Sequence, residues 1–315
     1  WGLDWSEKWP VMKVPPMTGL IKISRLLALR AVVEAEEGRP QDAVATIRLL
    51  LRVARTLDEA GPLLIGRMVQ AALYANACDA ARLVLPRAPA AAAQSAWGPY
   101  LDPEALPKAY RDAMDLEFFG SKEWIADLSL KDASWRDALG GLFTQTADIF
   151  AMEMSPLMTY YWPFIKLDVA SFYRGALGFR RLFDGSYADA RSGWKRVYAD
   201  FERQGWIFAE IAMPDLSRTY GRVLAGQARL RLARVALAAK RFKEERGRWP
   251  ASARELGSLL PGGAADAADP LAGRPFAFKP SAKGLTVYSL GEDGDDDGGA
   301  PWDKAKEDGD LAWTL

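Results

Sequence analysis

Apolar residues recur with a period close to 3.6 over most of this chain, a pattern that predicts helices. The first predicted helix presents a wide apolar face that includes Ile23, Leu26 and Val33. Gly38 and Pro40 follow this face and are typical stop signals for a helix. Residues 87–94, rich in Ala and Pro, are interpreted as a linker. Further helices are expected over residues 41–59, 63–85, 104–119, 184–204 and 215–246.

The first two predicted helices resemble one hairpin of the tetratricopeptide type. Ala31, Gly38 and Ala43 match positions where small residues let the two helices of such a repeat approach closely. No second copy is found at a matching period, so a repeat array is not supported. A plain antiparallel helix pair is an alternative interpretation of the same residues, and both stay open.

The last fifty or so residues change to the alternation that predicts strands. Residues 275–278 and 284–289 are separated by Lys-Pro-Ser-Ala-Lys-Gly, which is typical of an antiparallel hairpin, and residues 311–315 predict a closing strand. The predicted fold is therefore mainly α: a multi-helix body, tetratricopeptide-like or irregular, followed by a long helix and a small antiparallel β module. We place the helical body, with its Trp- and Pro-rich N-terminal arm, in residues 1–214 and the long helix and β module in residues 215–315.

Composition excludes more functions than it suggests. The chain has 315 residues, half of them hydrophobic and 26% charged, which is enough for a sizeable core. Its 41 basic and 41 acidic residues cancel, so no overall field attracts nucleic acid or anionic lipid. The absence of histidine removes His-activated nucleophiles and imidazole metal ligands. The single cysteine, Cys78, is interpreted as a small buried hydrophobe because its neighbours are apolar.

Two segments allow a functional and a structural interpretation. Residues 157–183 are dense in aromatic side chains, which predicts either a groove for a sugar or peptide or, preferably, core between helices. The long helix 215–246 has a basic face, which we interpret as solvated because a nucleic-acid stripe would interleave aromatic residues. This face comprises Arg229, Arg231, Arg234, Lys240, Arg241 and Lys243.

The N-terminal residues bear on location. No stretch reaches the roughly 18 uninterrupted apolar residues that a membrane span needs. The chain starts at Trp1 without a methionine, and we interpret this as trimming of a signal peptide or membrane anchor upstream of residue 1. This interpretation predicts an extracytoplasmic protein, in the periplasm or at the cell surface, with an optional membrane anchor.

Carboxylates are concentrated in the glycine-rich stretch 291–299 and again just before the last predicted strand. Such a cluster repels itself unless a cation lies among its members. Calcium takes six to eight hard oxygen ligands and tolerates irregular geometry, so a loop of this composition suits it. An EF-hand is excluded because its twelfth position, which must be a bidentate carboxylate, would be Lys304. A solvated acidic turn is the alternative.

The order of motifs from about residue 230 onward resembles the periplasmic head of the major pseudopilin of type II secretion systems. A long helix, a Gly-Arg-Trp-Pro turn, an Asp-Pro step, a Ser-Leu-Gly-Glu-Asp-Gly loop and an Asp-Gly-Asp-Leu ending follow one another. The resemblance covers about the last quarter to third of the chain and implies a three-stranded sheet that holds one calcium ion. It implies ligands at the carbonyl of Leu290 and the carboxylates of Asp293, Asp308 and Asp310.

This chain differs from that family in what precedes the head. Some two hundred residues of helical domain replace the hydrophobic filament helix of a pseudopilin, and in this the chain resembles a class of uncharacterised bacterial proteins. We therefore expect a non-enzymatic extracytoplasmic interaction or structural protein with an unidentified protein partner and no nucleic acid. The alternative is a carboxylate-based hydrolase with its site in the helical body. Its candidate acids are Asp115, Glu117, Asp148 and Glu153.

Overall fold

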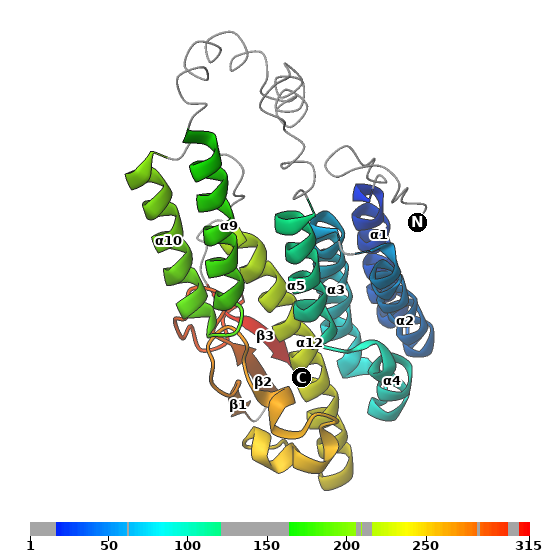
Figure 1. Cartoon of the computed structure of the whole chain (residues 1–315). Helices are drawn as coiled ribbons and strands as arrows, with labels where there is room; N and C mark the ends of the chain where they lie inside the picture. Colours follow the sequence, from blue (N-terminus) through cyan, green and yellow to red (C-terminus); the bar gives the residue numbers. More distant parts are fainter. Residues whose placement is uncertain are drawn as a thin grey trace.

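The computed structural model describes residues 17–61, 63–120, 164–205, 209, 216–281, 284–301 and 309–315. Within these ranges the chain is mostly helical and its sheet lies near the C-terminus, so the predicted fold class is confirmed (Figure 1). The predicted N-terminal arm, residues 121–155 and residues 206–208 and 210–215 lie outside the described part. The helices are α1 (Thr18–Glu36), α2 (Pro40–Thr56), α3 (Leu64–Val84), α4 (Ala90–Trp97), α5 (Ala105–Phe119), α9 (Ile165–Leu182), α10 (Tyr187–Gln204) and α12 (Leu216–Arg246).

The first three helices pack against one another, with α1 lying against both α2 and α3. Ala31 and Ala43 are fully buried where α1 meets α2, as the small-residue pattern predicted. Gly38 has φ of 76° in the tight turn between them, a conformation that favours glycine. The buried carboxylate of Glu34 accepts a hydrogen bond of 2.7 Å from the Thr46 hydroxyl across the helix pair.

Residues 87–94 are not a linker throughout, because most of them belong to α4. Alanine has the highest helix propensity, and Pro89 immediately before the helix is compatible with its first turn. Trp97, at the end of α4, is 1% exposed and donates a hydrogen bond of 3.0 Å to the carbonyl of Val44. Tertiary packing of this tryptophan therefore fixes the alanine-rich segment on α2.

Helix α12 lies in the centre of the molecule and packs against both the helical body and the sheet (Figure 1). It is continuous over 31 residues, as the absence of Gly and Pro after Gln227 predicted. Leu230, Leu232 and Val235 are fully buried and do not share one face, so the helix is apolar on more than one side. A single hydrophobic core includes α1, α12 and the sheet, while the division into residues 1–214 and 215–315 stays a prediction.

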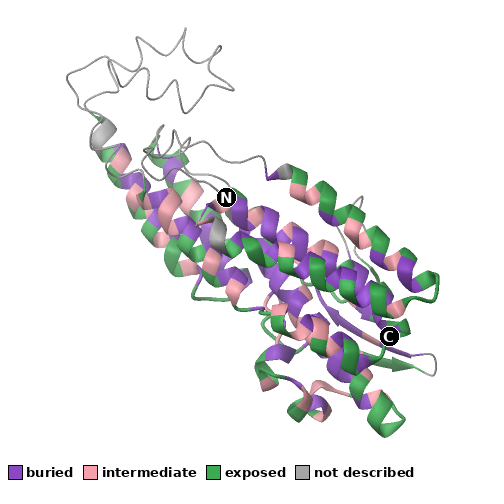
Figure 2. Ribbon diagram, turned by 90° about the vertical axis from the view of Figure 1, so that its right-hand side faces the viewer, coloured by how far each residue is buried: buried purple, intermediate pink, exposed green. Residues whose placement is uncertain are grey.

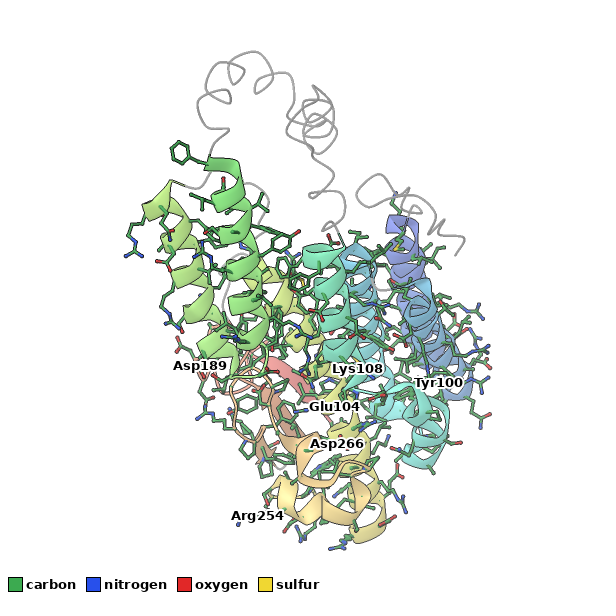
Figure 3. All side chains as sticks on the ribbon, in the orientation of Figure 1. Tyr100, Glu104, Lys108, Asp189, Arg254 and Asp266 are labelled. Carbon is green, nitrogen blue, oxygen red and sulfur yellow. The ribbon has the colours of Figure 1, made fainter. Side chains whose placement is uncertain are left out.

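The interpretation of the basic face of α12 as solvated is wrong for three of its members. Arg231 donates to the carbonyl of Ala268 at 2.8 Å, and Arg234 forms an ion pair of 2.8 Å with Asp266. Lys240 donates to three carbonyl groups that end α3 and precede α4. These cations therefore attach neighbouring segments to α12 rather than face water. Figure 3 labels Asp266 in the turn beside this helix.

The sheet has the order β1-β2-β3, with β1 at Ala277–Ser281, β2 at Gly284–Ser289 and β3 at Leu311–Thr314. Both pairs are antiparallel, which confirms the predicted hairpin and closing strand. The first strand begins two residues later than the predicted 275–278 and continues to Ser281, because residues expected in the turn pair with β2. In the register, Val287 faces both Phe278 and Trp313. Val287 and Trp313 are buried, and β2 and β3 both contact α12. The small sheet therefore completes its core with the long helix.

Helices α9 and α10 form a pair that packs on α5 and α12. Phe172 and Phe179 of α9 are 3% and 1% exposed, and the ring of Phe179 lies 4.0 Å from that of Trp194 on α10. The core interpretation of the aromatic-rich segment is therefore confirmed for these two residues. The part of that segment before Phe164 lies outside the described residues.

Candidate functional site

Asp310, one of the four predicted calcium ligands, is a buried carboxylate at the start of β3. This residue is only 1% exposed. Its backbone N–H donates to the carbonyl of Ala300 at 2.7 Å, and its Oδ2 accepts from the N–H of Gly299 at 2.7 Å. The other oxygen, Oδ1, is buried without any hydrogen-bond partner in the described structure. An unsatisfied buried carboxylate oxygen is costly and calls for an explanation.

The charges around Asp310 add to this cost. Burial raises the pKa of the Asp310 carboxyl, the Gly299 N–H lowers it, and the charges of Asp297, Asp296 and Asp293 raise it further. No lysine or arginine among the described residues forms an ion pair with Asp310. The acidic loop therefore surrounds a buried carboxylate with negative charge. A bound cation would offset both the burial of this charge and its repulsion by the neighbouring carboxylates.

Two other carboxylates of the loop, Asp293 and Asp296, bond to its own backbone. Asp293 Oδ1 accepts from the N–H of Asp295 at 3.2 Å. Asp296 Oδ1 accepts from the N–H of Gly298 and from the hydroxyl of Tyr288, each at 3.0 Å. These turns spread the carboxylates along the loop rather than gathering them.

Gly299 is the glycine on which this arrangement depends. Its φ of 84° directs its N–H to Asp310, and a Cβ at this position would lie 2.9 Å from Cγ2 of Thr286. A side chain would therefore be strained both by the backbone conformation and by contact with β2. The loop thus requires glycine beside its buried carboxylate.

Leu290, the predicted carbonyl ligand, lies buried at the point where β2 enters the loop. Its N–H donates to Asp269 Oδ2 at 3.3 Å, while Asp269 Oδ1 accepts from the N–H of Leu271 at 2.9 Å. Asp269 is 2% exposed and thus holds the start of the module against the start of the loop. Sequence analysis used its Asp-Pro step only as a motif and did not predict this anchoring role.

The predicted set of ligands is only partly assembled. Asp310 and Asp293 belong to one electrostatic cluster, and Leu290 lies at the start of the same loop. Asp308 lies outside the described residues. Within the described ranges, no three carboxylates converge closely enough to hold a metal ion. Asp296 and Asp297, which were not predicted, raise the pKa of Asp310 more than Asp293 does.

Glu292 belongs to the same loop but turns toward the helical body. Its carboxylate accepts a hydrogen bond from the hydroxyl of Tyr187 on α10, and its carbonyl accepts from Arg191 at 3.3 Å. Burial raises the pKa of Glu292, although nearby arginines oppose this. Burial and the Glu292 charge together raise the pKa of Tyr187 to about 12. A Cβ on Gly221 of α12 would lie 2.6 Å from the Tyr187 hydroxyl and 2.8 Å from Glu292 Oε2.

The acids proposed for a hydrolase do not form a pair in the described residues. Burial raises the pKa of Glu117 to about 7, with only the Leu64 N–H opposing it. No carboxylate of the described residues is among the causes of that pKa shift. Asp115 forms an ion pair of 2.8 Å with Arg180. Asp148 and Glu153 lie outside the described part of the chain.

Comparison with protein-family models, with curated proteins and with solved structures found no match. The resemblance to a pseudopilin head therefore depends on the sequence motifs and on the three-stranded sheet that follows the long helix. None of the helices in the described residues is both long and apolar enough to cross a membrane.

Proposed function

We propose that this protein is a non-enzymatic, extracytoplasmic interaction or structural protein with a calcium-stabilised C-terminal module. The observation that supports it is Asp310, whose buried Oδ1 has no partner among the described residues and whose neighbours are the carboxylates of the acidic loop. The motif resemblance to the calcium-binding pseudopilin head supports the same interpretation. Bound calcium would supply the positive charge that offsets this cluster.

The residues of the loop fit calcium in type. Asp310 offers a hard oxygen from a fixed position, because hydrogen bonds to Ala300 and Gly299 hold it. We assign Asp293, Asp308 and the carbonyl of Leu290 as its co-ligands, in line with the motif resemblance. Asp296 and Asp297, whose charges also raise the pKa of Asp310, offer further carboxylate oxygens to the same ion. Irregular oxygen sets of this kind are those that calcium accepts.

The site would act on the position of the module rather than on a substrate. Glu292 precedes the proposed ligand Asp293 and bonds to Tyr187 of α10, so order in the loop extends to the α9–α10 pair. Arg231 and Arg234 hold the turn before the sheet on α12. A calcium-ordered loop would therefore keep the module attached to the helical body that binds the unidentified protein partner.

The proposed location follows from the expected strength of the site. Extracellular calcium modules bind with dissociation constants of roughly 10⁻⁴–10⁻³ M, and a loop that must rearrange around the ion belongs to this class. Such a site fills where free calcium is millimolar, outside the cytoplasm. The protein would then be periplasmic or exposed at the cell surface.

Hydrogen exchange of the full chain in calcium, magnesium or chelator tests this proposal. The Gly299 amide, which bonds to Asp310, and the amides of β3 should exchange more slowly in calcium than in chelator. Magnesium should have a smaller effect because it requires octahedral geometry and keeps its waters. Amides in the middle of α3 serve as the internal control. Equal exchange of the loop in all three buffers would contradict the proposal.

A carboxylate-based hydrolase is the second candidate, and Glu117 is the observation that favours it. A carboxyl with a pKa of about 7 has the protonation behaviour of a general acid. Glycoside hydrolysis needs a second carboxylate, which the described residues do not place beside it. Assays with chromogenic glycosides and esters test this candidate, and turnover that is lost in Glu117→Gln would support it.

A further inference from the structure

The outer face of the α1–α2 hairpin combines exposed apolar side chains with unpaired cations. Leu26 and Leu29 of α1 are 66% and 62% exposed, more than the other large apolar residues of the described chain. Val33 of α1 and Leu49 of α2 are also exposed. Isolated exposed apolar residues are ordinary, but a group on adjoining helices indicates an interaction surface.

The three apolar side chains of α1 share one stripe of that helix with a lysine. Lys22, Leu26, Leu29 and Val33 are spaced by four, three and four residues, which places them on the same face of a helix. The opposite face of α1 is buried on α2 and α3, where Ser24 accepts a hydrogen bond of 2.7 Å from Asn76. The stripe therefore lies on the side of α1 that faces away from α2 and α3, and we call these four residues the crest. Figure 2 views the molecule from this side and shows exposed residues along α1.

The register of the hairpin brings basic residues of α2 beside this crest. The hydrogen bond between Glu34 and Thr46 fixes which residues are level with each other. Because antiparallel helices advance in opposite directions, α2 residues 48–52 are level with α1 residues 28–32. Arg48 and Arg52, both exposed on α2, are therefore level with the crest, one on either side of Leu49 in the sequence.

The cations around the crest have no anionic partner within the described part of the chain. Lys22, Arg25, Arg48 and Arg52 are exposed, and none of them forms an ion pair with a described carboxylate. Over residues 18–35 and 43–56 the only acid is Glu34, which is buried and bonded to Arg30 and Thr46. The whole chain is neutral, so this positive face is a local concentration of charge.

We propose that the outer face of the α1–α2 hairpin docks on an anionic lipid surface. A convex apolar crest with a basic rim matches the boundary between acyl chains and negatively charged headgroups. The leucines enter this boundary, while the lysine and arginine side chains contact the headgroups. A partner protein helix would need a groove, whereas this face is a ridge. The inference does not depend on calcium binding.

Vesicle flotation of the full chain tests the proposal. The probes are vesicles of phosphatidylcholine alone and vesicles in which about a quarter of the lipid is phosphatidylglycerol. The protein should float with the anionic vesicles, not with the neutral ones, and salt should weaken binding. The variant Arg48→Gln/Arg52→Gln should bind about thirtyfold more weakly, since each basic residue near such a surface strengthens binding roughly fivefold.

Matched variants separate a specific face from general stickiness. Leu26→Gln/Leu29→Gln should abolish flotation, whereas Leu177→Gln, which changes an exposed leucine of α9, should not. Lys195→Gln/Arg196→Gln, which removes two exposed cations of α10, should also bind as the wild type does. Circular dichroism checks that each variant is folded. Equal binding to both vesicle types, or self-association that is lost in Leu26→Gln/Leu29→Gln without lipid binding, would overturn the proposal.

Discussion

The substitution Asp310→Asn tests the argument that the buried, unsatisfied carboxylate of Asp310 is a calcium ligand. It keeps the shape of the side chain and the acceptor for Gly299 but removes a charge that is buried with one oxygen unsatisfied. Such an unsatisfied buried group costs about 1–3 kcal/mol. In chelator the variant should therefore be more stable than the wild type by about 1 kcal/mol, because the new amide donors take back part of the gain.

Calcium should reduce the advantage of the variant, and reverse it where binding is tightest. At millimolar calcium and the dissociation constants expected for this class, binding adds roughly 0.4–1.4 kcal/mol to the free energy of unfolding of the wild type. Asp310→Asn loses a ligand, so calcium should leave its stability unchanged. Urea unfolding followed by circular dichroism and tryptophan fluorescence, with calcium or chelator, measures both differences.

The pH dependence of the free energy of unfolding provides an independent test of the same argument. The folded-state pKa of Asp310 is raised, so its contribution to stability is greatest when it is protonated and is lost as the pH rises through that pKa. In chelator, this contribution should fall as the pH rises above the ordinary aspartate pKa of about 3.9. In calcium the proton competes with the ion, so the gain from calcium should grow over the same range. A wild type and Asp310→Asn with identical pH dependence in chelator would refute this reasoning.

Three further substitutions test contacts that position the module and the helices. Gly221→Ala would place a Cβ against the contact between Tyr187 and Glu292 and should lower the free energy of unfolding by about 1–3 kcal/mol in urea. Gly178→Ala, with open space around it, should raise the free energy of unfolding by up to about 1 kcal/mol in the same assay. Lys240→Met leaves three carbonyl groups without their donor and should cost about 1–3 kcal/mol; the neighbouring Arg241→Met should change the urea midpoint little. The pKa of Glu117 is raised to about 7, so the wild type should lose stability as the pH rises from the ordinary pKa range of a glutamate toward 7. Glu117→Gln should remove that loss, and an unchanged dependence of stability on pH would contradict the burial argument.

Local patterns predicted the helices and the hairpin because those elements depend on nearby residues. The apolar period defines α1, α2 and α3, and the alternation over β2 defines a strand that is buried on α12. The same reasoning failed for the basic face of α12. Arg231 and Lys240 look solvated on a helical wheel, but segments distant in sequence place carbonyl groups beside them. Only the tertiary structure supplies such partners.

The candidate site divides in the same way. A concentration of carboxylates is visible in the sequence, so Asp293 and Asp310 could be selected from the motif alone. The sequence does not reveal that Oδ1 of Asp310 is buried without a partner in the described ranges, since this depends on the strand pairing around it. Glu292 was missed because its partner Tyr187 is over a hundred residues away, and the only signal was a glycine at Gly221.

Calcium titration by isothermal calorimetry tests the central claim most directly. The wild type should release or absorb heat on binding, with a dissociation constant of roughly 10⁻⁴–10⁻³ M. Asp310→Asn and Asp293→Asn should show no binding in that range. Asp295→Asn, which makes the same change of charge in the same loop, should bind calcium as the wild type does. No heat from the wild type at millimolar calcium, or equal binding by all four proteins, would contradict the account and leave a solvated acidic turn.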